Sequence, residues 1–413
     1  MKKTLTYVTG AVGLMLAACQ PSAQKASEGG LLHIDVAGAM EVLTELKVSD
    51  LGTHVRYVPL ETNDSCLIGR NPEIKVLDKQ ILVKSGNDLY GFDKETGRFL
   101  NSIGHVGDDP EGYSQGGLPT YNAYNGLLYF VRQPDQLQKF DLQGNYRGKD
   151  IVPTPPAMPT DYAFIDTLTV GCYNNIGQQN THNRSLAFFT ETGELTDTMN
   201  SLLPALPPME ITDIARIDVK KFGNMGAIFT RFQNGTASTS IAGVPLLWKT
   251  GGKLRFKEIF SDTLYNIARP GSIMPYAVLE TGKWHFPAEA RQETSGSDSK
   301  LLPTIVLEND SVIFFQCVRG LYEGEPEVLN GIYDKTASTT RMTQESQGIA
   351  DDVNGFLPFH PNTCGTQGEF AQIVEASEVL EWLDEHPEAK DNPVFTSLLH
   401  LNEENNPIVI LVE

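Results

Sequence analysis

Three stretches of the chain share one pattern: LYGFDKETG at residues 89–97, LQKFDLQG at 137–144 and LAFFTETG at 186–193. Each is a short apolar strand that ends at an aromatic residue and leads into a turn containing glycine. Phe92, Phe140 and Phe189 occupy matching positions, with steps of 48 and 49 residues between them. Glycine suits such hairpin turns because it adopts a positive φ without strain. A step of this length with four short strands is typical of one blade of a β-propeller.

The residues around these stretches supply the other strands of each unit. The first copy also contains apolar segments at 74–77, 80–83 and 99–103, and less regular copies follow at 227–279 and 303–336. The 37 glycines and 24 prolines suit many short strands joined by turns. The alternative is a hairpin repeat in a β-sandwich. Three copies in phase favour an all-β propeller.

Two apolar segments at opposite ends of the chain are predicted to close this ring. Residues 55–60 alternate as a half-buried strand does, and residues 407–412 (PIVILV) form an apolar strand at the carboxyl end. Pairing the two in the final blade leaves no open sheet edge.

Two segments depart from the strand pattern. Residues 31–51 have helical or mixed patterning. Apolar residues of the stretch 368–400 fall at helical spacing, with Glu and Asp on the other face, so an acidic helical insertion is predicted there. A last propeller unit is expected to begin with a strand at 354–359.

The amino terminus has the features of an export signal. Lys2 and Lys3 precede an apolar stretch from Tyr7 to Ala18, which is shorter than the about 20 residues that a membrane-spanning helix needs. Residues 16–19 (LAAC) resemble the lipobox of bacterial lipoproteins, which implies cleavage after residue 18 and lipidation of Cys19. The alternative is an ordinary secretory signal with an incidental cysteine.

The residues after Cys19 indicate the destination. Residues 19–30 are small and polar, and they are predicted to form a lipidated flexible tether. In the enteric sorting rule an aspartate after the cysteine retains a lipoprotein in the inner membrane, and Gln20 stands there instead. The sequence thus favours the outer membrane, facing the periplasm rather than the cell surface, with the lipid as the contact to the membrane.

The charge of the chain excludes one class of partner. It carries 32 Lys and Arg against 52 Asp and Glu, a net charge of −20. A field of this sign repels phosphate backbones, so no nucleic-acid partner is expected. It also argues against polybasic attachment to anionic lipids.

Taken in order, several segments resemble those of six-bladed β-propeller lipoproteins, which are distant relatives of NHL and TolB-like propellers. They are YVPLET at 57–62, LIG at 67–69, FSDTLYNI at 260–267, PY at 275–276 with Gly282 and Pro287, and NPIV at 406–409. The likeness spans residues 55–412 and implies one six-bladed domain over 31–413. One turn departs from the family pattern, because GHVGDDPEGY at 104–113 has Asp109 and Glu111 where glycines are usual.

The sequence contains no convincing catalytic or metal-binding set. None of the eight histidines has the spacing of a metal site, and no cofactor or metal is predicted. His360 and Cys364 would make a Cys–His pair, although a loop entering the last blade is the simpler interpretation. Cys66, Cys172, Cys317 and Cys364 allow three disulfide pairings, and Cys172 and Cys317 are predicted to be buried.

The candidate ligand-binding residues are therefore side chains in predicted loops. Aromatic residues there stack on sugars or, more often, pack between blades. The candidates are Tyr113, Tyr121, Trp284, His285 and His360.

These observations predict a non-enzymatic, lipid-anchored binding module whose ligand is a carbohydrate or a peptide. One alternative is a hydrolase or lyase acting on glycans, built from blade-edge loops. Another is a structural partner in an outer-membrane complex.

Overall fold

A computed structural model describes residues 30–413 except 115, 155–156, 175–182, 207–209, 223–224, 293–298 and 323. The described chain is all-β, as predicted, with seven small sheets. Two α-helices accompany them, α1 (Val36–Glu41) and α2 (Ala376–Glu385). The predicted signal segment and Cys19 lie outside the described residues.

Six sheets are built around sets of four strands, and we number them 1 to 6 along the chain. Sheet 1 contains β3 (Glu73–Val76), β4 (Gln80–Ser85), β5 (Asp88–Asp93) and β6 (Phe99–Ser102). Sheet 2 contains β7 (Thr120–Asn122), β8 (Leu127–Arg132), β9 (Gln136–Phe140) and β10 (Tyr146–Ile151). Sheet 3 contains β11 (Asp161–Ile165), β12 (Leu168–Cys172), β13 (Arg184–Phe189) and β14 (Leu195–Asn200).

The later sheets are less uniform, as predicted. Sheet 4 contains β18 (Leu247–Thr250), β19 (Lys253–Phe256), β20 (Thr263–Arg269) and β21 (Ser272–Leu279), with β1 (Leu32–Ile34) added in parallel to β21. Sheet 5 contains β22 (Leu301–Glu308), β23 (Val312–Arg319), β24 (Glu327–Asp334) and β25 (Thr339–Gln344). Sheet 6 contains β26 (Thr363–Cys364), β27 (Phe370–Val374), β28 (Ile408–Val412) and β2 (Val55–Pro59). Between sheets 3 and 4 lies a three-stranded inserted sheet of β15 (Ile214–Phe222), β16 (Met225–Phe232) and β17 (Ala237–Ala242).

The repeat that the sequence indicated is a structural repeat. Phe92, Phe140 and Phe189 lie on β5, β9 and β13, the third strands of sheets 1, 2 and 3, and each ring is at most 2% exposed. In each sheet the following turn contains a glycine at positive φ. Matching positions in the sequence therefore mark matching positions in successive sheets.

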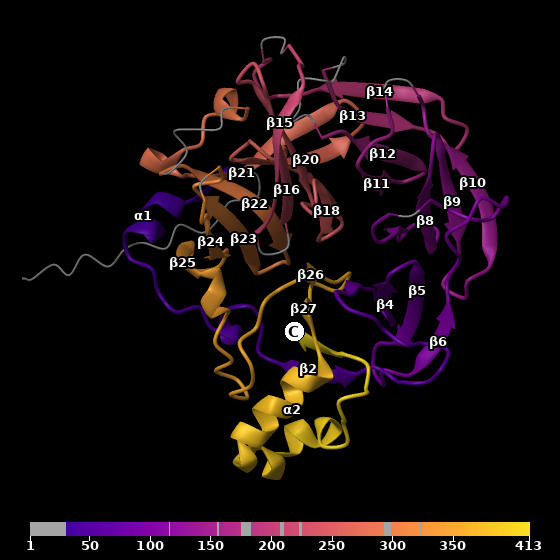
Figure 1. Cartoon of the computed structure of the whole chain (residues 1–413), viewed down its shortest axis with the longest axis vertical. Helices are drawn as coiled ribbons and strands as arrows, with labels where there is room; N and C mark the ends of the chain where they lie inside the picture. The colour runs from indigo at the N-terminus through magenta and orange to yellow at the C-terminus, as the bar shows by residue number, and fades with distance from the viewer. Residues whose placement is uncertain are drawn as a thin grey trace, which may run out of the picture.

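The sheets follow one another around the middle of the molecule (Figure 1). Their first strands meet there: β7 contacts β11, β11 contacts β18, and β26 contacts both β22 and β3. Side chains from neighbouring sheets pack into shared hydrophobic clusters, so each sheet buries its faces against the next.

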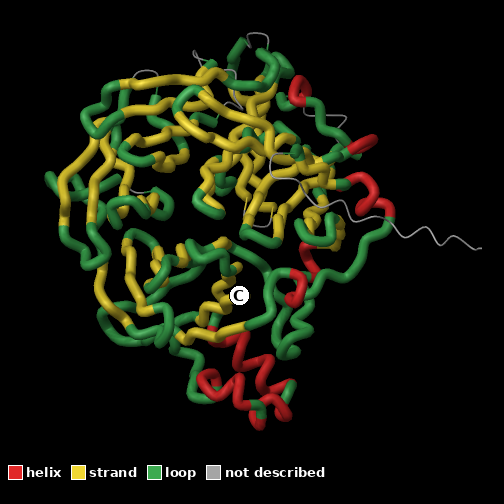
Figure 2. Tube along the Cα trace, turned by 180° about the vertical axis from the view of Figure 1, so that it is seen from behind, coloured by secondary structure: helices red, strands yellow, loops and turns green. Residues whose placement is uncertain are grey.

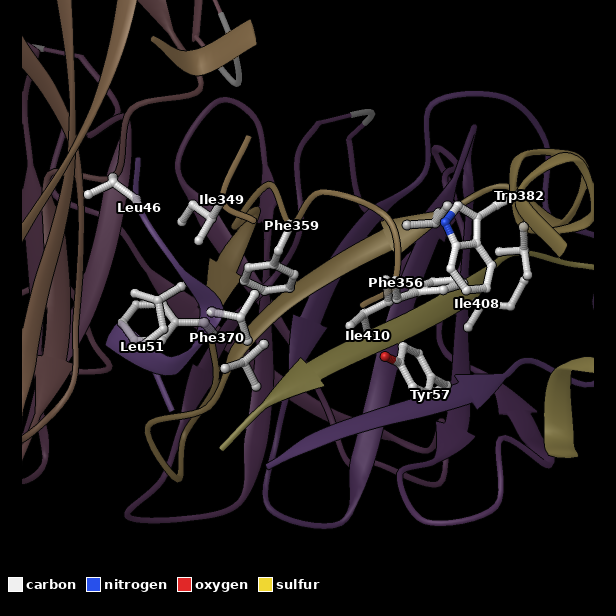
Figure 3. Close-up of a cluster of buried hydrophobic side chains, with 14 of the residues drawn as sticks. Leu46, Leu51, Tyr57, Ile349, Phe356, Phe359, Phe370, Trp382, Ile408 and Ile410 are labelled. Atoms are coloured by element: carbon white, nitrogen blue, oxygen red, sulfur yellow. The ribbon is translucent and has the colours of Figure 1, made fainter. Parts of the chain in front are cut away.

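The predicted pairing of the two ends of the chain is confirmed. β2 pairs antiparallel with β28 over its whole length, from Val55 opposite Val412 to Pro59 opposite Ile408. Every residue of β28 is buried. In Figure 3, Tyr57 of β2 lies close to Ile410, in the same cluster as Phe356 and Trp382. The Tyr57 ring lies 4.9 Å from Phe356 and 5.4 Å from Phe395 between centroids.

The predicted helical insertion is shorter than expected. Phe370–Val374 is not helical but forms β27, which pairs with β28. α2 begins after it and buries Val379, Trp382 and Leu383, while its acidic residues face solvent as predicted. Figure 2 shows the helices of this segment in red, outside the strands.

The strand expected at 354–359 is also absent from the described chain. Phe356 and Phe359 are buried there, but only Phe359 makes a β-bridge, to Ile349. The innermost strand of sheet 6 is instead β26. The apolar residues of this segment pack as a loop over the cluster that holds β2 and β28 together.

A buried ionic cluster joins sheets 4 and 5. The Glu308 carboxylate, at the end of β22, accepts hydrogen bonds from Arg255 Nε (3.1 Å), Trp248 Nε1 (2.9 Å) and the Tyr276 hydroxyl (2.8 Å). Lys335 Nζ lies 2.7 Å from Glu308 Oε1. Burial alone would raise the pKa of Glu308, but the cations Arg255 and Lys335 outweigh it and hold the pKa below its ordinary value. Lys94 and Glu369 form a comparable buried pair between sheets 1 and 6.

The four cysteines after residue 19 are all free thiols in the structure. Cys172 and Cys317 are fully buried within strands of sheets 3 and 5, as predicted. Cys66 is buried as well, and Cys364 is partly buried.

Candidate functional site

Charged side chains from three different sheets lie on the first strands, near the middle of the molecule. Lys75 belongs to β3, Asp161 begins β11, and Lys249 belongs to β18. Each retains contact with solvent. Yet the surrounding protein lowers the pKa of each lysine and raises the pKa of Asp161, and both changes favour the neutral form of the group. These three charged side chains on the first strands, which we call the axial group, form the candidate site.

Asp161 joins sheet 3 to sheet 4. Its Oδ2 accepts hydrogen bonds from the backbone N–H groups of Leu246 (2.9 Å) and Leu247 (3.0 Å), at the start of β18. Burial raises the pKa of Asp161, and these bonds and Lys75 offset only part of that shift. The carboxylate therefore has a structural role in fixing the first strands next to each other.

Lys75 faces the same region from sheet 1. Burial lowers the pKa of Lys75, and the nearby Asp161 carboxylate opposes this shift. The Asp161 carboxylate therefore offsets only part of the effect of burial on the charged form of Lys75. An anion placed beside it would favour its charged form.

Lys249 and Tyr124 meet across two sheets. Tyr124 lies in the connection between β7 and β8, and Lys249 Nζ stands 4.0 Å from the centre of its ring. The backbone N–H of Tyr124 donates a hydrogen bond to Asn122 Oδ1 (2.9 Å). The tyrosine remains 57% exposed, so it presents an aromatic surface beside a cation. Burial lowers the pKa of Lys249, with Tyr124 opposing.

Tyr113 and Tyr121 lie in or against one hydrophobic cluster between sheets 1 and 2. Tyr113 is 7% exposed and stacks on Phe130 with ring centroids 4.2 Å apart. Burial raises its pKa to about 12. Tyr121, on β7, is partly buried against the same cluster. Packing therefore accounts for the position of Tyr113.

The other candidates lie elsewhere. Trp284 is partly buried beside sheets 4 and 5, with Lys283 Nζ 4.3 Å from its ring. His285 Nδ1 lies 2.8 Å from Asp262 Oδ2, and His360 Nδ1 lies 3.7 Å from Glu345 Oε1. The structure does not bring the five candidates together at one place.

The Cys–His pair gains no support from the geometry. Cys364 Sγ donates to the Glu308 carbonyl at 3.4 Å, and burial raises its pKa to about 12. A reactive cysteine instead needs a lowered pKa. His360 approaches Glu345 rather than the thiol.

Sequence reasoning missed the axial charges. Lys75 and Lys249 each stand alone in an apolar segment, Ile74–Leu77 and Leu246–Thr250. A single lysine inside a strand that should be buried was the signal available.

Among the described residues, no cluster of three or more His, Cys, Asp or Glu side chains is placed to hold a metal ion. In the same part of the chain, no helix is long and apolar enough to cross a membrane.

Comparison with solved structures shows the fold of this chain in one protein of known structure. A crystal structure of a protein from Bacteroides fragilis, described as a "putative exported protein", superposes with a TM-score of 0.64 at 15% identity, covering 93% of this chain and 99% of that one. The structure titled U3-55K gives a TM-score of 0.37 at 11% identity over 89% of this chain and 100% of its own. BamB from Moraxella catarrhalis gives 0.28 at 10% identity over 59% and 68%. No curated protein matches the sequence. Residues 31–413 match the family described as a domain of unknown function, DUF4934, and the chain belongs to that family.

Proposed function

We propose that this chain is an exported, lipid-anchored, six-bladed β-propeller that binds an acidic carbohydrate on its axis without transforming it. Lys249, placed over the ring of Tyr124, carries this proposal, with Lys75 on the first strand of sheet 1 as the second cation.

The propeller interpretation is supported by the order of the sheets. Six sets of four strands follow one another along the chain, and the last set takes β2 from the amino-terminal end. Contacts between first strands are those expected where blades meet at an axis. The inserted sheet and β1 are additions to this plan.

Export and anchoring are supported by the residues before and at Cys19. The lysines, the short apolar stretch and LAAC at 16–19 occur in the order that a lipoprotein signal requires. The similar fold of a protein described as exported agrees with this. Labelled fatty acid should enter the wild-type protein expressed in a Gram-negative host and not Cys19→Ser; equal labelling of both would contradict the anchor.

The ligand class is inferred from the chemistry of the axis. Lys249 and Lys75 supply positive charge from the first strands of two sheets, and a nearby negative charge stabilises the ammonium form against the burial that lowers each pKa. Lys249 Nζ lies over one face of the Tyr124 ring, and the surface of the tyrosine that remains exposed can contact a sugar ring. A sugar bearing a carboxylate satisfies both.

The binding test uses a soluble form that begins at residue 20. Calorimetry should detect binding of trigalacturonate and not of neutral maltotriose. Lys249→Met should weaken binding at least tenfold, while Lys253→Met, an exposed lysine on β19, should leave it unchanged. The proposal would be rejected if trigalacturonate did not bind the wild-type protein, or if Lys249→Met bound it as tightly as the wild type does. Shortening of the trisaccharide during incubation would indicate an enzyme instead.

A further inference from the structure

We infer that the free edge of β15 docks an extended, acidic segment of a partner protein. This surface belongs to the inserted sheet, so the inference stands or falls independently of the axial ligand. Three observations carry it: an exposed apolar face, a cavity on that face, and a basic strand edge on an acidic protein.

One face of the inserted sheet is fixed to the body of the molecule. Phe222, Met225 and Phe229 are at most 3% exposed and join the hydrophobic cluster of sheets 3, 4 and 5. The Phe229 ring lies 5.2 Å from that of Tyr322. The Thr239 hydroxyl on β17 lies 3.3 Å from the Tyr322 hydroxyl. The inner face of the inserted sheet is therefore fixed to the body of the molecule through side chains of both β16 and β17.

The opposite face is apolar and open to solvent. Side chains alternate across a strand, so Ile217 and Val219 of β15 share the outer face with their cross-strand neighbours Thr230 and Ile228 of β16. Ile217 is 54% exposed, Val219 74% and Ile228 45%. These three β-branched side chains form one exposed apolar patch that a partner could cover.

A cavity continues this face toward the start of β15. Its volume is about 570 Å³, and Ile211, Ile214, Thr230, Phe232 and Ser238 are among its lining residues. Thr230 and Ser238 pair with each other across β16 and β17, in the same row as Ile217. The patch therefore ends in a recess large enough to accept an apolar side chain of a docked strand.

The edge itself is long and basic. β15 has nine residues and pairs only with β16 among the described strands, so its other side offers backbone N–H and C=O groups for a further strand. It carries Arg216, Lys220 and Lys221 against Asp218, a net of +2, on a protein whose net charge is −20. Charge complementarity favours an added strand that alternates acidic and apolar side chains.

A second copy of this chain is a poorer occupant. Two β15 strands side by side would bring together six cations and two carboxylates. The bodies behind them would each carry −20. Both repulsions oppose self-association, whereas an acidic segment is attracted by the net charge of +2 on the edge.

The test measures peptide binding to the soluble protein that begins at residue 20. The probe is a fluorescein-labelled decapeptide of alternating glutamate and valine. Decapeptides of lysine with valine and of glutamate with serine separate the contributions of charge and apolar contact. Fluorescence anisotropy should show saturable binding of the glutamate–valine peptide alone, weakened by raised salt.

Two variants locate the site. Val219→Asp adds a like charge to the exposed edge and should weaken binding at least tenfold, while Leu67→Asp, 57% exposed outside the inserted sheet, should not. Circular dichroism checks that both remain folded; Ile217→Asp replaces Val219→Asp if the latter does not. Absence of glutamate–valine binding, equal binding of the lysine peptide, or binding unaffected by the edge variant would overturn the inference. A wild-type dimer that the edge variant dissociates would assign the surface to a second copy instead.

Discussion

Replacing Glu308 with glutamine should destabilise the protein strongly. The wild-type carboxylate is fully buried and neutralises Arg255 and Lys335, which are 5% and 16% exposed. Glutamine keeps the shape of the side chain but leaves both cations without their counter-charge. It also offers one acceptor oxygen where the carboxylate offers two.

The magnitude follows from the burial of the two cations. Removing one partner of a buried ion pair costs about 3–5 kcal/mol. Lys335 can shift toward solvent, but Arg255 lies with its guanidinium 3.5 Å from the Tyr276 ring, and its Nη1 already lacks a hydrogen-bond partner. With an unfolding entropy of about 2.1 cal/mol/K per residue over roughly 380 residues, this loss lowers the melting temperature by about 4–6 °C.

Urea unfolding at pH 7 and calorimetry provide the assay. The matched control is Glu73→Gln. It removes the ion pair between Glu73 and Lys84, in which the Glu73 side chain is 53% exposed. It should change the free energy of unfolding by less than about 0.5 kcal/mol. A loss of under about 1 kcal/mol in Glu308→Gln would refute the reasoning, because it would mean that the cations are not desolvated.

Acid provides a second check on Glu308. Its folded-state pKa lies below the unfolded value, so the carboxylate contributes stability that is complete above the unfolded pKa. That contribution is lost as the pH falls through the folded pKa. The gap in stability between wild type and Glu308→Gln should therefore narrow on acidification below pH 4.5, the ordinary value for a glutamate. A constant gap would contradict this.

Three other changes probe closure, turn geometry and thiol burial. Ile410→Ala on β28, 2% exposed and opposite Tyr57, should cost about 2–5 kcal/mol of unfolding free energy in urea titrations; a smaller loss would show that the closing strand is weakly packed. Gly97→Ala should lower the melting temperature more than Gly86→Ala, since both have positive φ but only the first would place a Cβ 1.9 Å from a backbone oxygen, that of Pro59. In the form that begins at residue 20, the four thiols should not react with Ellman's reagent at pH 8 until urea unfolds the protein, because burial raises their pKa values; one fast thiol in the native protein would contradict this.

Local patterns predicted much of the fold. The hairpins around Phe92, Phe140 and Phe189 were predictable because strand alternation and glycine turns depend only on residues that are close together in the sequence. The pairing of β2 with β28 was predictable for a different reason. Each is an apolar strand at one end of the chain, and each needs a partner.

The errors lie where tertiary pairing overrides local spacing. Phe370, Ile373 and Val374 have helical spacing. The segment nevertheless forms β27, because it pairs with the second edge of β28. Phe356 and Phe359 have the composition of a strand, yet they pack as a loop over the cluster around Tyr57. Neither outcome can be derived from a window of sequence.

The axial site was beyond sequence reasoning for a geometric reason. Lys249 and Tyr124 are 125 residues apart and belong to different sheets, as do Lys75 and Asp161, 86 residues apart. Which first strands face each other depends on how many sheets there are and where the inserted sheet interrupts them. A lone lysine in an apolar strand marks a residue of interest, but its partners emerge only when the sheets are placed.

The charges of this protein act at two ranges, and together they narrow the proposed ligand. At an ionic strength of about 0.1 M, charges more than about 10 Å apart are largely screened, so the proposed small anion at the axis would respond mainly to Lys75 and Lys249, which attract it, and to Asp161, which repels it. A long polyanion would lie along the outer surface, where the net charge of −20 opposes it outside local basic segments such as β15. This distribution supports the proposal of a short acidic oligosaccharide as the axial ligand, and it disfavours a long polyanion such as a nucleic acid as a partner.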